Sequence, residues 1–420
     1  MQSKYKRLGE YIQPVVGRNK DLENLPLVGL SITKKFIPSI ANIIGTDMST
    51  YRTIERNQFA YGPVTSRNGD KITIALFDDY DKALISQAYI PFEVKDENEL
   101  VPEYLMMWFR RPEFDRYARF KSHGSAREIF DWEEMCSTLL PIPTVEKQRE
   151  IVKEYNVIQN RININNQLIT KLEETAQAIY KQWFVDFEFP DENGKPYKSN
   201  DGEMVFNKEL DKQIPSSWNI FELITFCDVK GGKRLPKGVE LNDEKNGRPY
   251  IKVADMNKSK YLTLQEQFQF VSDEIQSQIS RYIVNKDDVI LSIVGTIGLV
   301  NIIHDSLDEA NLTENCVKLT NIKKISSDFL YHFLSSPIGE KLIETRTVGG
   351  VQAKLPLYNI QSLPILFPEN HLILRFDMII QKINEVLKNK NLEMNQFSLL
   401  RSLLLAKMTK IESGMETVEN

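Results

Sequence analysis

Glycine next to long cationic or amide side chains marks the two places where this sequence could bind an anion. In the first, Gly231-Gly232-Lys233-Arg234, a flexible backbone and a guanidinium group could approach a phosphate or a guanine edge. The window from Asp228 to Lys260 holds nine basic and five acidic residues, in a chain whose net charge is −5. A solvated basic loop without a ligand is the alternative reading, and the sequence leaves both open.

The second place occurs twice, at an offset of 225 residues. Ser122–Arg127 (Ser-His-Gly-Ser-Ala-Arg) corresponds to Thr347–Gln352 (Thr-Val-Gly-Gly-Val-Gln). Arg127 is chemically able to read guanine and Gln352 adenine in the major groove, and a phosphate contact is at least as plausible for Arg127. We predict DNA contacts at Ser125, Arg127, Gly349 and Gln352.

Further candidate DNA contacts are basic residues of predicted loops and turns. They are Lys34, Lys35, Arg52, Arg56 and Arg67 in the first half of the chain and Lys233, Arg234, Arg248 and Lys252 in the second.

Motifs that would carry catalysis are missing from the sequence. There is no GxxxxGK[ST] phosphate loop and no HExxH metal motif, and the four histidines are isolated from one another. There is no Asn-Pro-Pro-aromatic tetrad for amine methylation and no glycine fingerprint for a methyl donor. Gly295-Thr296-Ile297-Gly298 lies between two predicted strands and favours a hairpin turn over a phosphate site. We therefore expect a binding scaffold with no catalytic residue, metal or cofactor of its own.

Two long helices are predicted to position these loops. Apolar residues recur at alternating steps of four and three from Ile151 to Trp183, and again from Phe376 to Met408, with polar Asn165 and Lys390 at corresponding positions. This spacing is typical of a coiled-coil seam, and two such helices most simply pack on each other. The predicted seam is Ile151, Ile158, Ile162, Leu172 and Ile179 in the first helix and Ile383, Leu387, Met394, Phe397 and Leu404 in the second.

The repeat extends from these helices back into the globular parts. Glu103–Pro112 matches Asp328–Pro337 at an offset of 225, and Leu140-Pro141-Ile142 matches Leu363-Pro364-Ile365 at 223. Nearer the start of each copy the offset falls to about 215, so the second copy carries a longer insert in its front half. The chain is predicted to be a tandem duplication.

Each copy mixes strands and helices, which predicts an α+β fold with two such domains alternating with two long helices paired as an antiparallel coiled coil. Predicted strands are 71–77, 88–94, 288–294 and 299–303, and predicted short helices are 102–120 and 327–345. The predicted domains are 1–143 and 215–367, the long helices 144–187 and 368–411, a linker with a small hairpin 188–214, and a frayed acidic tail 412–420.

Composition limits the class of protein. The 420 residues are 41% hydrophobic and 26% charged, typical of a protein that buries sizeable cores. No apolar run approaches the roughly 18 residues of a membrane span, no secretory signal is present, and three scattered cysteines favour reduced thiols in the cytoplasm. The acidic balance argues against nucleic-acid binding, but local segregation of charge can offset it.

The sequence resembles the specificity subunits of type I restriction–modification systems over essentially its whole length. The resemblance rests on the order of domains and helices, on Leu140–Pro143 followed by Glu146–Ile151, and on Ala176–Phe187. The second copy departs from the pattern, because Leu403–Met408 lacks the Trp-Phe-Val-Asp ending of the first helix.

This resemblance implies a non-catalytic subunit that binds double-stranded DNA. It also implies methyltransferase subunits, two in number, and restriction subunits as partners, which would use S-adenosylmethionine, ATP and Mg. We expect a bipartite, asymmetric DNA target. The alternatives are the same module in a modification-only system and a coiled-coil interaction scaffold without DNA specificity.

Overall fold

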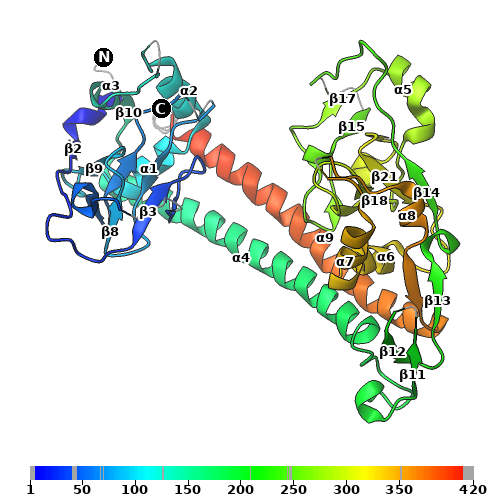
Figure 1. The fold of residues 1–420 in the computed structure, drawn as a ribbon. Helices are drawn as coiled ribbons and strands as arrows, with labels where there is room; N and C mark the ends of the chain where they lie inside the picture. Colours follow the sequence, from blue (N-terminus) through cyan, green and yellow to red (C-terminus); the bar gives the residue numbers. More distant parts are fainter. Residues whose placement is uncertain are drawn as a thin grey trace, which may run out of the picture. The chain divides into compact units, whose positions relative to one another are not determined.

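The computed structural model divides the chain into two compact units (Figure 1). Unit 1 comprises Met1–Asn166 and Asn391–Asn420, and unit 2 comprises Gln167–Lys390, so each unit holds one globular domain and half of each long helix. The structure describes residues 5–39, 45–66, 68–69, 71–124, 127–208, 210–243, 245, 248–350 and 352–409.

The globular domain of unit 1 contains two four-stranded sheets. The first is antiparallel throughout, in the order β2 (Ile12–Pro14), β9 (Ile90–Val94), β6 (Phe59–Tyr61), β7 (Ile74–Leu76). The second has the order β4 (Phe36–Pro38), β3 (Leu27–Leu30), β8 (Lys82–Ile85), β5 (Arg52–Glu55), in which β3 and β8 are parallel. A β1 (Tyr5–Arg7)–β10 (Leu139–Pro141) pair joins the domain's two ends.

The globular domain of unit 2 repeats most of this topology, but β16 adds a fifth strand to one sheet and the other has three strands. Its larger sheet has the order β14 (Asp228–Gly231), β21 (Cys316–Thr320), β18 (Val289–Ser292), β19 (Val300–Ile303), β16 (Tyr261–Leu262). The smaller sheet has the order β17 (Gln269–Phe270), β15 (Pro249–Ile251), β20 (Asn311–Leu312), with β15 and β20 parallel. A β13 (Asn219–Glu222)–β22 (Pro364–Phe367) pair corresponds to β1–β10. The duplication therefore includes the front halves, where the sequences diverge.

Two sequence predictions about short elements were wrong in detail. The sequence alternates over 71–77 as a half-buried strand would, but Ile72, Thr73, Ile74 and Ala75 are all buried. Each predicted short helix is in fact two helices, because Pro112 and Pro337 have no backbone N–H to continue the preceding helix and instead begin the next one. The pairs are α1 (Pro102–Phe109) with α2 (Pro112–Phe120), and α6 (Ser327–Leu334) with α7 (Pro337–Arg346).

The remaining short elements connect these layers. They are η1 (Leu8–Glu10), η2 (Met48–Thr50), α3 (Trp132–Ser137), η3 (Lys198–Asn200), β11 (Met204–Asn207), β12 (Lys212–Pro215), η4 (Leu223–Thr225), η5 (Val253–Asp255), α5 (Asp273–Ile279), η6 (Ser280–Tyr282), η7 (Asp305–Leu307) and α8 (Leu357–Gln361). The hairpin β11–β12 lies in the predicted linker.

The two long helices are α4 (Val145–Phe184, 40 residues) and α9 (Asn370–Lys407, 38 residues). In unit 1 the start of α4 shares a core with the end of α9, where Tyr155 and Leu405 are both buried. In unit 2 the end of α4 shares a core with the start of α9, and the rings of Tyr180 and Phe376 lie 5.9 Å apart. The halves are thus antiparallel within each unit, and the predicted fold class is confirmed.

The predicted seam faces inward in both helices. Asn165 is only 4% exposed, and its amide donates to Glu393 Oε2 at 3.0 Å. Arg401 Nη1 donates to Gln159 Oε1 at 3.1 Å. Seam positions that are buried or half-buried are Ile151, Ile158, Ile162, Leu172, Ile179, Ile383, Leu387, Met394, Phe397 and Leu404. Among the described residues, no helix combines the length and the apolar character needed to cross a bilayer.

Candidate nucleic-acid interface

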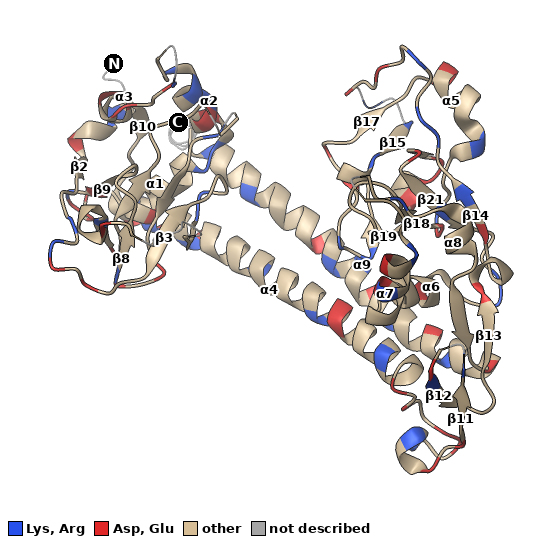
Figure 2. Ribbon diagram, in the orientation of Figure 1, with Lys and Arg blue, Asp and Glu red and all other residues tan. Residues whose placement is uncertain are grey.

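Basic and acidic residues are interspersed along the ribbon of both units (Figure 2). The question for each predicted contact is therefore whether its charge is already neutralised within the protein.

Lys34 does not face solvent, contrary to the prediction. Its Nζ lies 2.8 Å from Asp115 Oδ1 on α2 and also donates to the carbonyl of Phe109, and its side chain is 7% exposed. Burial lowers the pKa of Lys34, and the Asp115 carboxylate opposes that shift. The ammonium group belongs to the core of unit 1.

The other predicted contacts of this sheet vary in accessibility. Lys35 is exposed in the β3–β4 turn. Arg56 is exposed but forms an ion pair with Asp81 at 3.1 Å and donates to the Asp78 carbonyl at 2.6 Å. Arg52 is half-buried on β5, and its Nε has no hydrogen-bond partner in the part of the chain that is described. Since β8 separates β5 from β3, the sheet does not bring Arg52 and Lys35 together. Arg67 and Ser125 lie outside the described residues.

The glycine-rich stretch of unit 2 is a site of close backbone packing. A Cβ on Gly232 would lie 2.0 Å from the Thr313 carbonyl oxygen, so only glycine fits there. Lys233 is exposed above the Tyr282 ring, 5.7 Å from its centroid. Arg234 pairs with Glu314 at 2.5 Å. The predicted anion loop therefore keeps one cation, Lys233, that has no carboxylate partner among the described residues.

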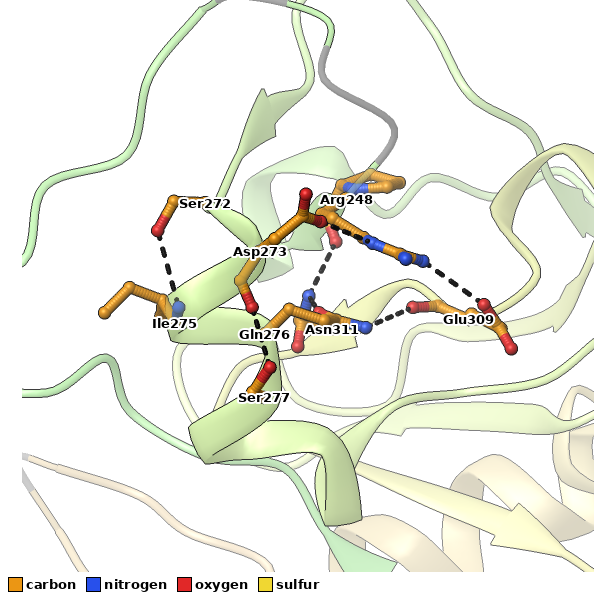
Figure 3. Close-up of polar contacts among 9 residues, drawn as sticks. Arg248, Ser272, Asp273, Ile275, Gln276, Ser277, Glu309 and Asn311 are labelled. Atoms are coloured by element: carbon orange, nitrogen blue, oxygen red, sulfur yellow. Dashed lines mark hydrogen bonds and ion pairs between the residues drawn. The ribbon is translucent and has the colours of Figure 1, made fainter.

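Arg248 is engaged in holding α5 (Figure 3). Its Nε donates to Asp273 Oδ1 at 3.1 Å and its Nη1 to Glu309 Oε2 at 3.2 Å. Gln276 on α5 donates to the Glu309 carbonyl at 3.2 Å and accepts from Asn311 on β20. Because two carboxylates flank the guanidinium, this arrangement favours a positioning role over the predicted DNA contact.

Lys252 is similarly occupied, since its Nζ donates to Gln269 Oε1 at 2.8 Å. Two exposed cations that the sequence analysis did not select are Lys71 in unit 1 and Lys237 in unit 2. Both could have been predicted from the sequence, because they lie in loops that connect strands of the duplicated sheets.

The two glycine loops matched by the repeat form equivalent hairpins. We call them hairpin 1 (His123–Ile129) and hairpin 2 (Val348–Lys354). Each is closed by reciprocal backbone bonds, of 3.1 and 2.9 Å in hairpin 1 and 2.8 and 2.9 Å in hairpin 2. Arg127 and Gln352 are exposed on them.

Buried polar groups attach each globular domain to its helices. In unit 1, Gln148 on α4 accepts from Val101 N and donates to the carbonyls of Glu99 and Pro143, all at 2.8 Å. Gln148 is fully buried. This attachment is neutral and depends on geometry alone.

In unit 2 the attachment is ionic. Lys260 Nζ lies 2.5 Å from Asp328 Oδ1 on α6, and Asn384 on α9 bonds to both partners. Nearby, Ser326 Oγ donates to Asp377 Oδ1 at 2.6 Å, and burial raises the pKa of Asp377 to about 6. This group was not predicted from the sequence, because its bonded partners are 51 to 124 residues apart along the chain.

His332 on α6 completes this group. Its Nδ1 lies 2.7 Å from Gln177 Oε1 on α4, while the Gln177 amide nitrogen donates to the His332 carbonyl. Gln177 Oε1 can only accept, so Nδ1 carries the proton and Nε2 is unprotonated. Burial lowers the pKa of His332 to about 3, and the ring stays neutral at ordinary pH.

No metal centre is found in the described residues, where no three His, Cys, Asp or Glu side chains are grouped to hold an ion. Cys227 and Cys316 are buried, and burial raises the pKa of each thiol to about 12, so both remain protonated.

Comparison with known proteins identifies the family. The model of the type I restriction modification DNA specificity domain matches residues 2–174 and again 215–396. The chain is 22% identical to the type I restriction enzyme HindI specificity subunit of Haemophilus influenzae, over 90% of this chain and 91% of that one. It is 23% identical to the MjaIX specificity subunit of Methanocaldococcus jannaschii, over 76% and 70% of the two chains.

A solved structure shares the fold. The crystal structure of the type I restriction–modification S subunit from M. genitalium aligns with a TM-score of 0.53 at 15% identity, covering 96% of this chain and 95% of that one. With the family matched once in each half, the chain belongs to the type I restriction–modification DNA specificity family, whose role is DNA target recognition and not catalysis, and it carries two copies of the specificity domain.

Proposed function

We propose that the two globular domains read the two halves of a bipartite, asymmetric DNA target. The observation that carries the proposal is the four-strand order shared by the two units, β2-β9-β6-β7 and β14-β21-β18-β19, with different side chains on the loops around it. Unit 1 has Lys35, Arg52 and Lys71 around its sheets, whereas unit 2 has Lys233, Lys237 and the inserted helix α5. Different contacts on one frame favour different base sequences.

A domain exchange tests this proposal. Residues 216–362 are replaced with the equivalent segment of a relative that recognises another target, and methylated genomic DNA is sequenced. One half of the methylated motif should change while the other half is retained. A motif that changes in both halves, or a native motif that is palindromic, contradicts the proposal.

We further propose that the exposed faces of α4 and α9 dock methyltransferase subunits. Opposite the seam in unit 1, α4 exposes Val157 (57%) and Ile164 (55%), and α9 exposes Leu392, Leu399 and Leu403, each at least half exposed. These residues are spaced by sevens and fours, which produces one apolar stripe per helix. Exposed stripes of this kind suit a partner's helices.

A matched pair of variants tests the docking surface. Ile164→Asp should leave thermal unfolding of the free chain unchanged but abolish co-purification with its methyltransferase subunit. Ile162→Ala, two residues away but 5% exposed, should instead lower the free energy of unfolding by about 2–4 kcal/mol. If Ile164→Asp retains the methyltransferase subunit, the stripe is not the docking site.

The cofactors follow from these partners. Methyl transfer from S-adenosylmethionine would belong to the methyltransferase subunits, and cleavage driven by ATP and Mg to the restriction subunits. This chain would recognise the DNA target sequence. Two methyltransferase subunits, one for each half of the duplication, are expected, and native mass spectrometry of the assembled complex counts them. A complex that methylates but never cleaves unmodified DNA with ATP would identify a modification-only system.

A further inference from the structure

Hairpins 1 and 2 are closed by the same pair of backbone bonds, between residues six positions apart in the sequence. Beyond the closing bonds, hairpin 1 is tied to the segment that follows β6, and hairpin 2 to the segment that follows β18. Phe130 N donates to the Pro63 carbonyl at 2.8 Å, and Leu355 N donates to the Ile293 carbonyl at 3.0 Å. Isolated bridges join Val64 to Ile129 and Val294 to Lys354. Both hairpins are therefore held at the C-terminal end of corresponding strands, β6 in unit 1 and β18 in unit 2.

A glycine with a positive φ angle follows the first residue of each hairpin. Gly124 and Gly349 have φ angles of +134° and +97°. An added Cβ would lie 2.1 Å from the Arg127 carbonyl oxygen in hairpin 1 and 2.9 Å from the Gln352 carbonyl oxygen in hairpin 2. In both hairpins the glycine lies against the carbonyl of the residue three positions later, where a side chain would not fit.

The side chains presented by the two turns share one chemical property. Arg127 and Gln352 are both exposed, and neither has an ion pair or side-chain hydrogen bond to another residue of the described chain. Arginine and the amide of glutamine both donate hydrogen bonds to phosphate oxygens. An exposed hydrogen-bond donor at the same place in both domains does not by itself distinguish two half-sites. It can instead bind the phosphate backbone, which is the same in every DNA sequence.

We infer that hairpins 1 and 2 are sequence-independent anchors that bind a DNA phosphate in each half-site through Arg127 and Gln352. This inference rests on the proposed two-domain reading of DNA and assigns these hairpins the non-discriminating part of it. Base recognition then falls to the loops that differ between the units. Reading of guanine by Arg127 and adenine by Gln352 is the opposing outcome.

Salt titration separates these outcomes. The complete complex with its methyltransferase subunits is assayed with wild-type chain, Arg127→Ala or Gln352→Ala, on a cognate and a scrambled duplex. Arg127→Ala should weaken binding to both duplexes by the same factor, on the order of tenfold. It should also reduce the slope of log K against log salt by about 0.9, because one fewer counterion is released.

Gln352→Ala should weaken both duplexes equally and leave that slope unchanged, because the amide is neutral. Arg7→Ala, an exposed arginine of unit 1 on β1, is the control and should alter neither affinity nor slope. The methylated motif should be the same for all variants. A variant that changes one base of the motif, or that binds both duplexes as tightly as wild type, overturns the inference.

The domain exchange described above keeps the two proposals apart. Suppose that the hairpin variants bind DNA like wild type and that exchange of residues 216–362 still changes one half-site. The phosphate-anchor proposal would then be wrong, and the proposal that each domain reads one half-site would stand. An exchange that changes both half-sites would remove the two-domain reading itself.

Discussion

Both units bury a lysine–aspartate ion pair, but the pairs join different parts of the shared frame. In unit 1, Lys34 from the β3–β4 turn meets Asp115 on α2, so the pair lies within the globular domain. In unit 2, Lys260 meets Asp328 on α6 and both bond to Asn384 on α9, so the pair reaches the long helix. The domain of unit 1 is attached to α4 by neutral Gln148 instead. The globular domain is thus attached to its long helix by an ion pair in unit 2 and by a neutral amide in unit 1.

Removing the carboxylates should have the largest effect. Asp115→Ala and Asp328→Ala each leave a buried ammonium without its counter-ion, which should lower the free energy of unfolding of the affected unit by about 3–5 kcal/mol. Each variant also removes the acceptor of a second donor, Ile72 N at Asp115 and the Asn384 amide at Asp328, so the two losses should be similar. Hydrogen exchange resolved by unit measures both.

Two controls frame that result. Asp81→Ala removes an exposed ion pair with Arg56 and should change stability by no more than about 0.5 kcal/mol. The double variant Lys260→Met, Asp328→Leu should recover part of the loss, because an apolar pair needs no counter-ion. If Asp115→Ala, Asp328→Ala and Asp81→Ala lowered the free energy of unfolding equally, burial of the ion pair would not be the cause of the loss.

Gln148→Glu tests whether the attachment in unit 1 depends on neutrality. A carboxylate could still accept from Val101 N but could not donate to the carbonyls of Glu99 and Pro143. Two buried acceptors without donors predict a loss of about 2–4 kcal/mol, confined to unit 1. Denaturant unfolding with a probe in each unit checks it, and Lys147→Ala, an exposed neighbour on α4, should be close to neutral.

Alanine at the two hairpin glycines sharpens the comparison of equivalent turns. Both positions have positive φ, so each substitution should cost about 1–3 kcal/mol. Gly124→Ala should cost more than Gly349→Ala, because its Cβ would approach a carbonyl oxygen to 2.1 Å rather than 2.9 Å. Thermal unfolding measures the order, and the reverse order would mean that the hairpins relax differently from their native geometry.

The smallest expected effect is a pH dependence of the stability of unit 2, caused by His332 and Asp377. His332 has its pKa lowered from 6.5 to about 3 on folding, so the unfolded chain binds more protons between those values and stability rises with pH. Asp377 has its pKa raised from 3.8 to about 6, so the folded chain binds more protons there and stability falls as pH rises.

Between about pH 4 and 6 these two slopes oppose each other. His332→Asn should reveal the slope of Asp377, and unit 2 should then lose up to about 1.4 kcal/mol per pH unit as pH rises through that window, relative to wild type. Asp377→Asn should reveal the opposite slope. Urea unfolding at several pH values tests both.

Local sequence patterns predicted the parts of this fold that depend on local physics. The period of the seam located α4 and α9, and apolar runs bounded by glycine located β18 and β19. Pro112 and Pro337 could have been recognised as helix starts, and their neglect was an error of interpretation. The shared order of the sheets could not be read from sequence, because it depends on strand pairings between distant residues whose side chains differ.

The candidate site was less predictable for the same reason. A lysine in a turn looks exposed until its partner is known, and Asp115 lies 81 positions after Lys34 along the chain. Arg234 and Arg248 likewise find carboxylates 80, 25 and 61 residues away. By contrast, the equivalence of hairpins 1 and 2 was visible in the sequence, because the internal repeat acts as its own alignment.

The hydrogen bond between Asn165 and Glu393 has a consequence for folding. Its partners are 228 residues apart, so α4 and α9 meet only after a large, entropically costly loop closes. A seam with a seven-residue period would accept a slip of one heptad with its apolar contacts largely preserved. Such a slip would place Val386 or Leu400 opposite Asn165 in place of Glu393. The buried Asn165 amide would then have no acceptor, which would destabilise the slipped pairing by about 1–3 kcal/mol. One polar pair thus lets a late-forming, repetitive interface reject its nearest misfolded alternatives.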